Sequence, residues 1–291
     1  MKVLITGAQG QVGRCLLASA PQDVTTVGLT RAQLDVGNAD AVNQAVELHR
    51  PNLIINAAAY TAVDRAETEV DAARRVNAQG PRHLARAAGK HGARLLHIST
   101  DFVFDGRAGV PYAPDAPTAP LGVYGQTKLE GEQAVRELLP QASVVLRTAW
   151  VYAPHGANFL RTMLRVMAEK RQVRVVADQI GTPTAADSLA AVLWGLAQRP
   201  EVTGVHHFTD AGVASWYDFA MAIFEEATLM GLLPPGVRVT PIATTDYPTP
   251  ARRPAYSVLD KRTLLAALPL EHQHWRVSLR RVLQGLQSPS C

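Results

Sequence analysis

The feature that most constrains this fold is a set of three glycines that directly follows the first predicted strand. Residues 2–6 are short, apolar and rich in β-branched side chains, and Gly7, Gly10 and Gly13 come after them at three-residue intervals. A helical pattern follows at residues 14–18. A glycine-rich turn between a first strand and a first helix lets a dinucleotide pyrophosphate contact backbone N–H groups. The plainer alternative is a tight strand-to-helix turn without a ligand.

Strand-like and helix-like segments alternate through the first half of the chain. The predicted strands cover residues 24–29, 53–58, 94–99 and 143–147. The predicted helices cover residues 39–49, 69–89 with an interruption near Gly80 and Pro81, and 123–138. Strands separated by helices pair in parallel through right-handed crossovers, and short apolar strands suit a sheet covered on both faces. The sequence therefore predicts an α/β fold with a Rossmann-type doubly wound parallel sheet.

Beyond Trp150 the alternation becomes less regular. The predicted elements are helices at 158–170, 184–198 and 215–230, strands at 173–178 and 204–208, and two short helices after a proline-rich stretch at 234–254. The second of these helices would be N-capped by Thr184 or Asp187. We expect residues 1–150, joined by parts of 184–210, to form a dinucleotide-binding domain. Residues 151–291 would form mainly a smaller C-terminal substrate-binding lobe.

Composition argues against several classes of protein. The chain has 291 residues, of which 47% are apolar and 19% charged, as in soluble globular proteins. It has no apolar run of about 18 residues, so no membrane partner is expected, and no signal peptide is recognised. The net charge of +4 is dispersed, so no nucleic-acid partner is expected. Cys15 and Cys291 lie at opposite ends, which favours a reducing, cytoplasmic location.

Tyr124 and Lys128 are four residues apart in a predicted helix, so they share a face. An unperturbed phenol has a pKa of about 10. A nearby ammonium favours the phenolate and lowers that pKa, which makes Tyr124 a proton donor or acceptor near neutral pH. The lysine is also suited to hold the ribose hydroxyls of a nicotinamide cofactor. The alternative is a surface tyrosine with a solvated lysine.

Ser99, Thr100 and Asp101 follow a predicted strand directly. Ligands of open α/β sheets bind at the carboxyl ends of the strands. A hydroxyl there is placed to hydrogen-bond a substrate carbonyl and share in polarising it. The alternative is an ordinary loop cap, because these residue types favour such positions.

Together these motifs resemble those of the extended short-chain dehydrogenases/reductases, in which the three-residue glycine spacing is typical. Within them, the chain is similar to the dTDP-4-dehydrorhamnose reductase family. The segments that carry this likeness are Asn56 to Asp64, Ser99 to Gly106, Tyr124 to Lys128, Arg147 to Tyr152 and Asp178 to Thr184. The match extends to about residue 190 and is looser beyond it, around Arg253 and Pro254.

The resemblance implies an NADPH-dependent reduction of the 4-keto group of a dTDP-4-keto-6-deoxysugar, dTDP-4-dehydro-β-L-rhamnose. Tyr124 would protonate the incipient alkoxide, and Lys128 would lower its pKa and orient the cofactor. Thr100 would hydrogen-bond the carbonyl oxygen, with Asp101 beside the sugar. Trp150 would contact the substrate, unless it is a core aromatic residue. The implied cofactor contacts are Gly7, Gly10, Gln11, Val12 and Gly13 at the pyrophosphate, Asp35 and Val36 at the adenine, and Ala57, Ala58 and Ala59 toward the ribose.

Thr30 and Arg31 follow the second predicted strand. Folds that bind NAD place an acidic residue there for the ribose 2′-hydroxyl, whereas an arginine accommodates a 2′-phosphate. The nearest acid, Asp35, comes later. We therefore expect a preference for NADPH, with NADH as a second cofactor that some family members accept. The alternative is a solvated Arg31.

The residues just after the glycine turn bear on magnesium binding and on the oligomeric state. Some members of the family form dimers that magnesium bridges through glutamates, one of them just after the glycine turn. This chain has Arg14 and Cys15 there, and no carboxylate before Asp23. Magnesium needs oxygen ligands, so we expect no metal ligand at this site and a monomer or metal-independent homodimer. Magnesium bound elsewhere stays open.

Two other functions remain as alternatives. An epimerase or dehydratase on a nucleotide sugar would use the same fold, but a dehydratase is expected to have Asp-Glu after the threonine, and here Phe102 follows Asp101. A non-catalytic regulatory subunit would bind NADP alone. The intact Thr100, Tyr124 and Lys128 argue against the second alternative.

Overall fold

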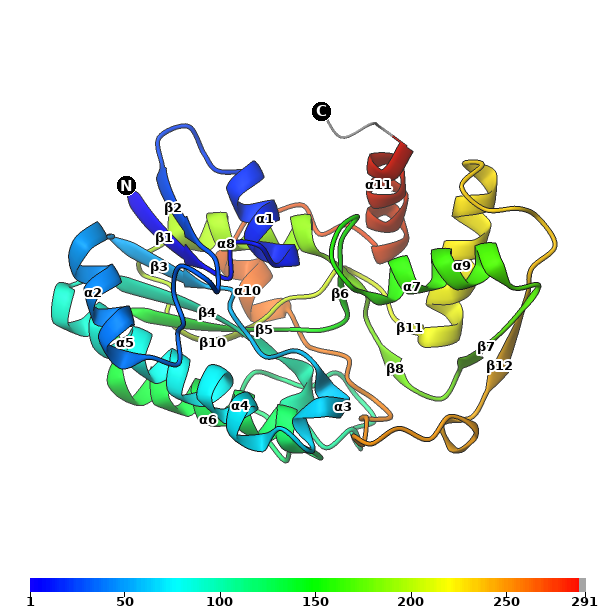
Figure 1. The fold of residues 1–291 in the computed structure, drawn as a ribbon, viewed down its shortest axis with the longest axis horizontal. Coiled ribbons are helices and arrows are strands. Elements are labelled where there is room, and N and C mark those ends of the chain that lie inside the picture. Colours follow the sequence, from blue (N-terminus) through cyan, green and yellow to red (C-terminus); the bar gives the residue numbers. More distant parts are fainter. Residues whose placement is uncertain (288–291) are drawn as a thin grey trace.

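A six-stranded parallel sheet forms the larger part of the molecule in the computed structural model, which describes residues 1–287 (Figure 1). Its spatial order is β10-β5-β4-β3-β1-β2. The strands are β1 (Lys2–Thr6), β2 (Thr25–Leu29), β3 (Leu53–Asn56), β4 (Arg94–Thr100), β5 (Ser143–Thr148) and β10 (Gly204–His207). All neighbouring pairs are parallel. The predicted doubly wound parallel sheet is confirmed.

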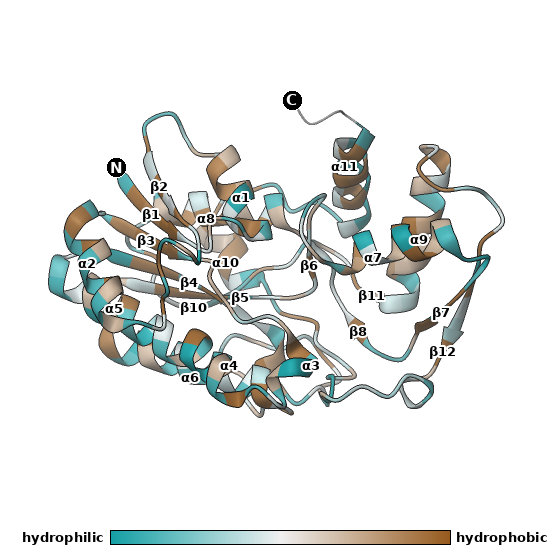
Figure 2. Ribbon diagram, viewed as in Figure 1, coloured by the Kyte–Doolittle hydropathy of each residue, from teal (hydrophilic) through white to brown (hydrophobic). Residues whose placement is uncertain are grey.

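Helices cover both faces of this sheet. On one face, α1 (Gln11–Ala18), α8 (Ala186–Ala197) and α10 (Arg262–Ala267) share a core with Val3 and Ile5 of β1. On the other, α2 (Ala39–His49), α5 (Gly80–His91) and α6 (Val123–Leu138) pack on Leu4. Successive side chains of a strand point to opposite faces, so β1 serves both cores. Figure 2 shows this as apolar strands between helices that carry hydrophilic bands outside.

The helical stretch predicted for residues 69–89 has no break at Gly80. Helix α4 (Val70–Arg74) continues through a π-helical turn, Arg75–Gln79, into α5 with right-handed helical backbone throughout. The interruption predicted near Gly80 and Pro81 is therefore a π-helical turn that ends at Gln79, and not a break in the helical backbone. Pro81 is tolerated because it lies in the first turn of α5, where its missing N–H is not needed. The carbonyl oxygen of Asn77, four residues before Pro81, approaches Gly131 of α6. A Cβ on Gly131 would lie 2.1 Å from that oxygen.

The smaller part lies beside the carboxyl ends of the sheet strands (Figure 1). Its core is formed by three helices, α7 (Phe159–Glu169), α9 (Trp216–Leu229) and α11 (Trp275–Gln287). Three two-stranded pairs complete it: β6 (Val151–Tyr152) with β9 (Thr184–Ala185), β8 (Ile180–Gly181) with β11 (Ala214–Ser215), and β7 (Gln172–Val176) with β12 (Arg238–Ile242). The proline-rich stretch thus contains a strand that the sequence did not predict. Pro241 is compatible with it because an edge strand loses no obligatory hydrogen bond there.

The N-cap predicted for the helix near residue 184 is also wrong. Thr184 belongs to β9, Asp187 lies inside α8, and Ala185 occupies the cap position without a side-chain cap. The carboxylate of Asp210 accepts the backbone N–H of Ala185 at 3.1 Å, so a residue distant in sequence replaces the cap.

Segments from the second half of the chain return to the sheet. Both α8 and β10 come from residues 184–210, and α10 also packs on the sheet. The assignment of separate domains remains a prediction. Within residues 1–287, no helix has the length and apolar character that crossing a membrane requires. Cys15 is a half-buried free thiol, and Cys291 lies outside the described residues.

Candidate active site

The glycine turn is built around two close backbone contacts. Gly7 has φ +68°, and a Cβ there would lie 2.7 Å from the backbone of Ala57. A Cβ on Gly13 would lie 2.3 Å from the Gly7 carbonyl oxygen. Gly10 is the N-cap of α1 and offers no side-chain cap. The N–H groups of the first turn, including those of Gln11 and Val12, are therefore free to bind an anion such as a cofactor diphosphate.

A buried polar chain joins the ends of β1 and β3 to the middle of β4. Asn56 Oδ1 accepts the Thr6 hydroxyl at 2.7 Å and the backbone N–H of Ala58 at 3.2 Å. Asn56 Nδ2 lies 3.0 Å from His97 Nδ1. Burial lowers the pKa of His97 well below its usual value, so the ring is neutral and accepts at Nδ1. This chain fixes the half-buried segment formed by Ala57, Ala58 and Ala59 beside the glycine turn.

The turn after β2 holds the residues expected near the adenine and its ribose. Burial would raise the pKa of Asp35, but hydrogen bonds from Arg75 at 2.5 Å and from the Gly37 N–H at 3.0 Å lower it overall. Val36 is buried, and the backbone N–H of Thr30 donates to Gln33. The exposed Arg31 side chain makes no hydrogen bond or ion pair to residues 1–287, so it is available for an anionic group.

Tyr124 and Lys128 lie on the same face of α6, toward the end of β4. Lys128 is 2% exposed, and its Nζ donates to the Ile98 carbonyl at 2.7 Å. Burial lowers the pKa of Lys128 to about 8, although the charge of Glu132 opposes this shift. A Cβ on Gly125 would lie 2.2 Å from the Phe102 carbonyl oxygen, so a glycine is needed for this close approach of α6.

The pKa of Tyr124 differs from the sequence prediction. Burial raises it to about 12, although a hydrogen bond with Thr100 lowers it. Lys128, whose ammonium is held by the Ile98 carbonyl, does not produce the predicted decrease. That prediction is wrong for the protein alone, because removal of the phenol from water dominates its pKa and the charge of Asp101 raises it further.

Thr100 and Asp101 lie between the end of β4 and Tyr124. The Thr100 hydroxyl accepts the Phe102 N–H at 3.3 Å and donates to Asp101 Oδ1 at 3.1 Å. It therefore caps the 3-10 helix Asp101–Val103 while it lies within hydrogen-bond reach of Tyr124. Burial raises the pKa of Asp101 to about 6, although hydrogen bonds with Ser257 and Thr100 lower it. Asp101 Oδ2 is buried and has no partner among the described residues.

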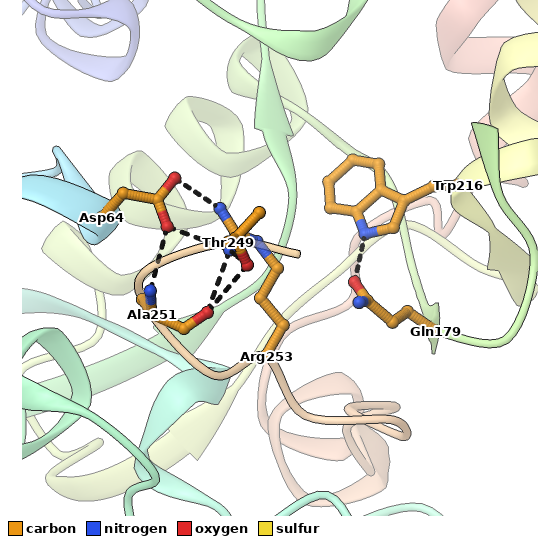
Figure 3. Close-up of polar contacts among 6 residues, drawn as sticks. All are labelled: Asp64, Gln179, Trp216, Thr249, Ala251 and Arg253. Carbon is orange, nitrogen blue, oxygen red and sulfur yellow. Dashed lines mark hydrogen bonds and ion pairs between the residues drawn. The ribbon is translucent and has the colours of Figure 1, made fainter. Parts of the chain in front are cut away.

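Trp150 is held in a strained conformation on the side of the smaller part. Its φ is +48°, which is uncommon outside glycine, and its ring stacks on Trp216 with centroids 3.5 Å apart. Trp216 Nε1 donates to Gln179 Oε1 at 3.2 Å (Figure 3). A Cβ on Gly181 would lie 2.7 Å from the Trp150 ring. Trp150 is half-buried, so one part of it is core and the other faces solvent.

Arg253 is engaged in an ion pair that sequence reasoning missed. Its two terminal nitrogens donate to the carboxylate of Asp64 at 3.0 and 2.9 Å, and Ala251 N–H donates to the same group at 3.2 Å (Figure 3). Asp64 lies on α3 (Val63–Ala66), after the alanine segment that follows β3. The pair connects the 249–254 loop to α3. Arg253 is therefore held in place by Asp64.

The smaller part also contacts the glycine turn through Gln11. Asn158 Nδ2 donates to Gln11 Oε1 at 2.8 Å, and His155 Nε2 lies 3.2 Å from the Gln11 carbonyl. Neither His155 nor Asn158 carries a motif that would have pointed to this contact. The structure thus places residues of both parts around one site.

Arg14 and Cys15 occupy the position at which other family members would bridge a metal. Arg14 Nε donates to the Gln9 carbonyl at 3.1 Å. Burial raises the pKa of Cys15 to about 11, with a contribution from the charge of Asp187, so this residue is a thiol. The described part of the chain contains no group of three or more potential ligands for a metal ion.

Comparison with known proteins shows which family this chain is similar to. A family model described as the RmlD substrate binding domain matches residues 1–288. The chain is 42% identical to a dTDP-4-dehydrorhamnose reductase of Aggregatibacter actinomycetemcomitans, over 97% of this chain and 98% of that protein. It is 46% identical to a protein of Streptomyces antibioticus named probable dTDP-4,6-dihydroxy-2-methyloxan-3-one 4-ketoreductase, over 98% and 96%.

A solved structure extends this likeness to three dimensions. The dTDP-4-dehydrorhamnose reductase of Bacillus anthracis, crystallised in complex with NADP, matches with a TM-score of 0.92 and 36% identity over 98% of this chain and 99% of that one. Sequence and fold agree over nearly the whole length. The chain therefore belongs to the dTDP-4-dehydrorhamnose reductase family of extended short-chain dehydrogenases/reductases.

Proposed function

We propose that this protein reduces the 4-keto group of dTDP-4-dehydro-β-L-rhamnose with NADPH and so forms dTDP-L-rhamnose. The observation that carries the proposal is the meeting of Thr100, Tyr124 and Lys128 at the carboxyl edge of the sheet, beside the glycine turn. An ionisable phenol, a hydroxyl and a buried ammonium at one point suit carbonyl reduction. Membership of the family supports the same reaction.

The residues of the turn fit the cofactor that this reaction needs. The uncapped first turn of α1 offers N–H groups to a diphosphate, and Gly7 and Gly13 keep the backbone close. Bound NADPH would supply the hydride. Lys128 would hold the ribose hydroxyls, and Arg31 would meet the 2′-phosphate because it is exposed and unpaired within residues 1–287. We therefore propose NADPH as the preferred cofactor.

Proton transfer would use three side chains in sequence. The Thr100 hydroxyl, which donates to Asp101 in the protein alone, would turn its proton to the substrate carbonyl oxygen and so polarise it. Tyr124 would give its proton to the developing alkoxide, and its pKa of about 12 keeps the phenol protonated at neutral pH. The charge of Lys128 would then stabilise the phenolate. This order makes Tyr124 the acid of the reduction.

Substrate contacts would come from both sides of the site. Asp101, buried and with one unpartnered oxygen in the described structure, would accept a hydrogen bond from a sugar hydroxyl. Trp150 would offer its half-buried ring to the sugar nucleotide, because its strained backbone and the stack on Trp216 hold that ring in place. Any dimer would be metal-independent, since Arg14 and Cys15 replace an acidic ligand. A cytoplasmic location stays a prediction.

A spectrophotometric assay tests the proposal. The protein is mixed with NADPH and a panel of dTDP-4-keto-6-deoxysugars, and loss of NADPH absorbance is followed. We expect turnover with dTDP-4-dehydro-β-L-rhamnose and dTDP-L-rhamnose as the product. Turnover of only a differently substituted dTDP-4-ketosugar would instead favour the specificity named for the Streptomyces relative. NADPH that stays unoxidised with every sugar would refute a reductase.

A further inference from the structure

A buried ion pair lies one helical turn beyond Lys128, on the same face of α6. Glu132 follows Lys128 by four residues and is 1% exposed, and Arg147 on β5 is 2% exposed. Arg147 Nη2 donates to Glu132 Oε2 at 2.7 Å, and Arg147 Nε lies 2.9 and 3.2 Å from the two carboxylate oxygens. The Ser99 hydroxyl on β4 donates to Glu132 Oε1 at 2.5 Å. The cluster of Ser99, Glu132 and Arg147 thus joins α6, β4 and β5.

The remaining bonds of Arg147 are also formed. Its Nη1 donates to the Pro114 carbonyl at 3.1 Å and lies 3.4 Å from His207 Nε2. The guanidinium lies 5.1 Å from the centre of the Phe104 ring. Burial and then the charge of Arg147 lower the pKa of His207 to about 3, so His207 is neutral and accepts. The guanidinium is therefore fixed on every side.

Stability alone does not account for such a cluster. Taking two charges out of water costs about as much as their attraction returns, and apolar residues of similar size often serve as well. The position of the cluster is informative instead. Ser99 directly precedes Thr100 in sequence. Glu132 lies one helical turn after Lys128, on the same face of α6. Each element that carries a reacting group is thus tied to the same carboxylate.

We propose, on the basis of the reductase function above, that Glu132 is a positioning residue of the site. Through Ser99 it holds the end of β4, and so the Thr100 hydroxyl, in register with α6. Its negative charge also keeps Lys128 in the ammonium form that holds the cofactor ribose and stabilises the phenolate. No group of the cluster touches the substrate in this assignment.

The charges around Lys128 support this role. The titratable groups that face Lys128 are Tyr124 and Glu132 on α6 and His97 on β4, with Arg147 and His207 behind Glu132. Both histidines are neutral because burial lowers their pKa values. Glu132 is therefore the anion of this group, and its charge raises the pKa of Lys128 against the effect of burial. Without it, the charge of Arg147 would be left uncompensated nearby.

The test is Glu132→Gln, which keeps the size of the side chain and removes the charge. NADPH affinity is measured by fluorescence from pH 6 to 9 without sugar, and turnover with dTDP-4-dehydro-β-L-rhamnose is measured separately. We expect the pH at which NADPH affinity falls to move down by about one unit, so that affinity weakens about threefold at pH 7.5 and about tenfold at pH 9. Glu226→Gln is the matched control, because Glu226 is also buried and is paired with Arg276 and Arg280 between α9 and α11 of the smaller part.

Ser99→Ala covers the case in which the first variant fails to fold, because it removes one hydrogen bond and leaves the ion pair intact. It should lower kcat about tenfold, as Thr100 loses its register, while the pH profile of NADPH binding stays as in the wild type. A folded Glu132→Gln protein with the wild-type pH profile would overturn the electrostatic role. Wild-type kcat in Ser99→Ala would overturn the role of the cluster in placing Thr100. Failure of the wild type to turn over the sugar would count against the proposed function instead.

Discussion

The glycine turn offers a test in which two energetic effects are separated by choice of position. Gly7 has φ +68°, and an added Cβ would lie 2.7 Å from backbone atoms of Ala57 and Ala58. Gly92, which ends α5, has nearly the same φ of +69°, but an added Cβ would meet nothing within 4 Å. Gly92→Ala therefore reports the cost of the backbone conformation alone. Gly7→Ala reports that cost together with the steric conflict.

The expected magnitudes follow from these contacts. A Cβ in the left-handed region costs about 1–2 kcal/mol, so Gly92→Ala should lower the free energy of unfolding by that amount. Overpacking against a neighbour that cannot yield adds about 1–3 kcal/mol. The neighbours of Gly7 are backbone atoms, so Gly7→Ala should lower the free energy of unfolding by about 2–5 kcal/mol.

Urea denaturation gives these free energies, and NADPH fluorescence gives the affinity of each variant. Gly7→Ala should also weaken NADPH binding at least tenfold, because relief of the conflict shifts the turn away from the end of β3. Gly92→Ala should bind NADPH as the wild type does. The reasoning fails if Gly7→Ala unfolds no more easily than Gly92→Ala, or if its NADPH affinity is unchanged.

Three further predictions follow from the site. Burial raises the pKa of Asp101 to about 6, so the free energy of unfolding of the wild type falls as the pH rises from 4 to 6. Asp101→Asn lacks this titration, so its free energy of unfolding, measured by urea denaturation, should gain up to about 3 kcal/mol relative to the wild type across that window. If the free energies of unfolding of the wild type and of Asp101→Asn differ by a constant amount from pH 4 to 7, the burial of this charge is contradicted. Arg31→Ala should weaken NADPH binding about tenfold and leave NADH binding within twofold, and an equal loss for both would remove Arg31 as a phosphate contact. Light scattering with and without a chelator should show the same oligomeric state, and a dimer that dissociates on removal of magnesium would contradict the expected independence from metal.

The sheet was predictable because its signals are local. Lys2 to Thr6, Leu53 to Asn56 and Ser143 to Thr148 are apolar runs separated by helical patterns, and this alternation permits few topologies. The position of Tyr124 and Lys128 on one face of α6 followed from their spacing. Their placement beside Thr100 followed from the rule that parallel strands end at one edge.

Contacts between distant segments were not predictable. The Asp64–Arg253 pair, the contact of Asn158 with Gln11 and the cap of Ala185 by Asp210 join residues that no local pattern connects. The pKa of Tyr124 was misjudged for the same reason, because spacing shows that a lysine is near but not how deeply the phenol is buried. The strand around Pro241 was missed because proline disfavours strands in general and is tolerated only at edges.

The most direct test of the central claim compares Tyr124→Phe with the wild type in the NADPH oxidation assay with dTDP-4-dehydro-β-L-rhamnose. The substitution removes one hydroxyl and little packing, and the fold and the glycine turn are untouched. If Tyr124 is the acid of the reduction, kcat falls by about 10²–10⁴-fold while NADPH affinity stays within a few-fold of the wild type. A variant that binds NADPH normally and retains kcat within a few-fold would contradict the assignment of Tyr124.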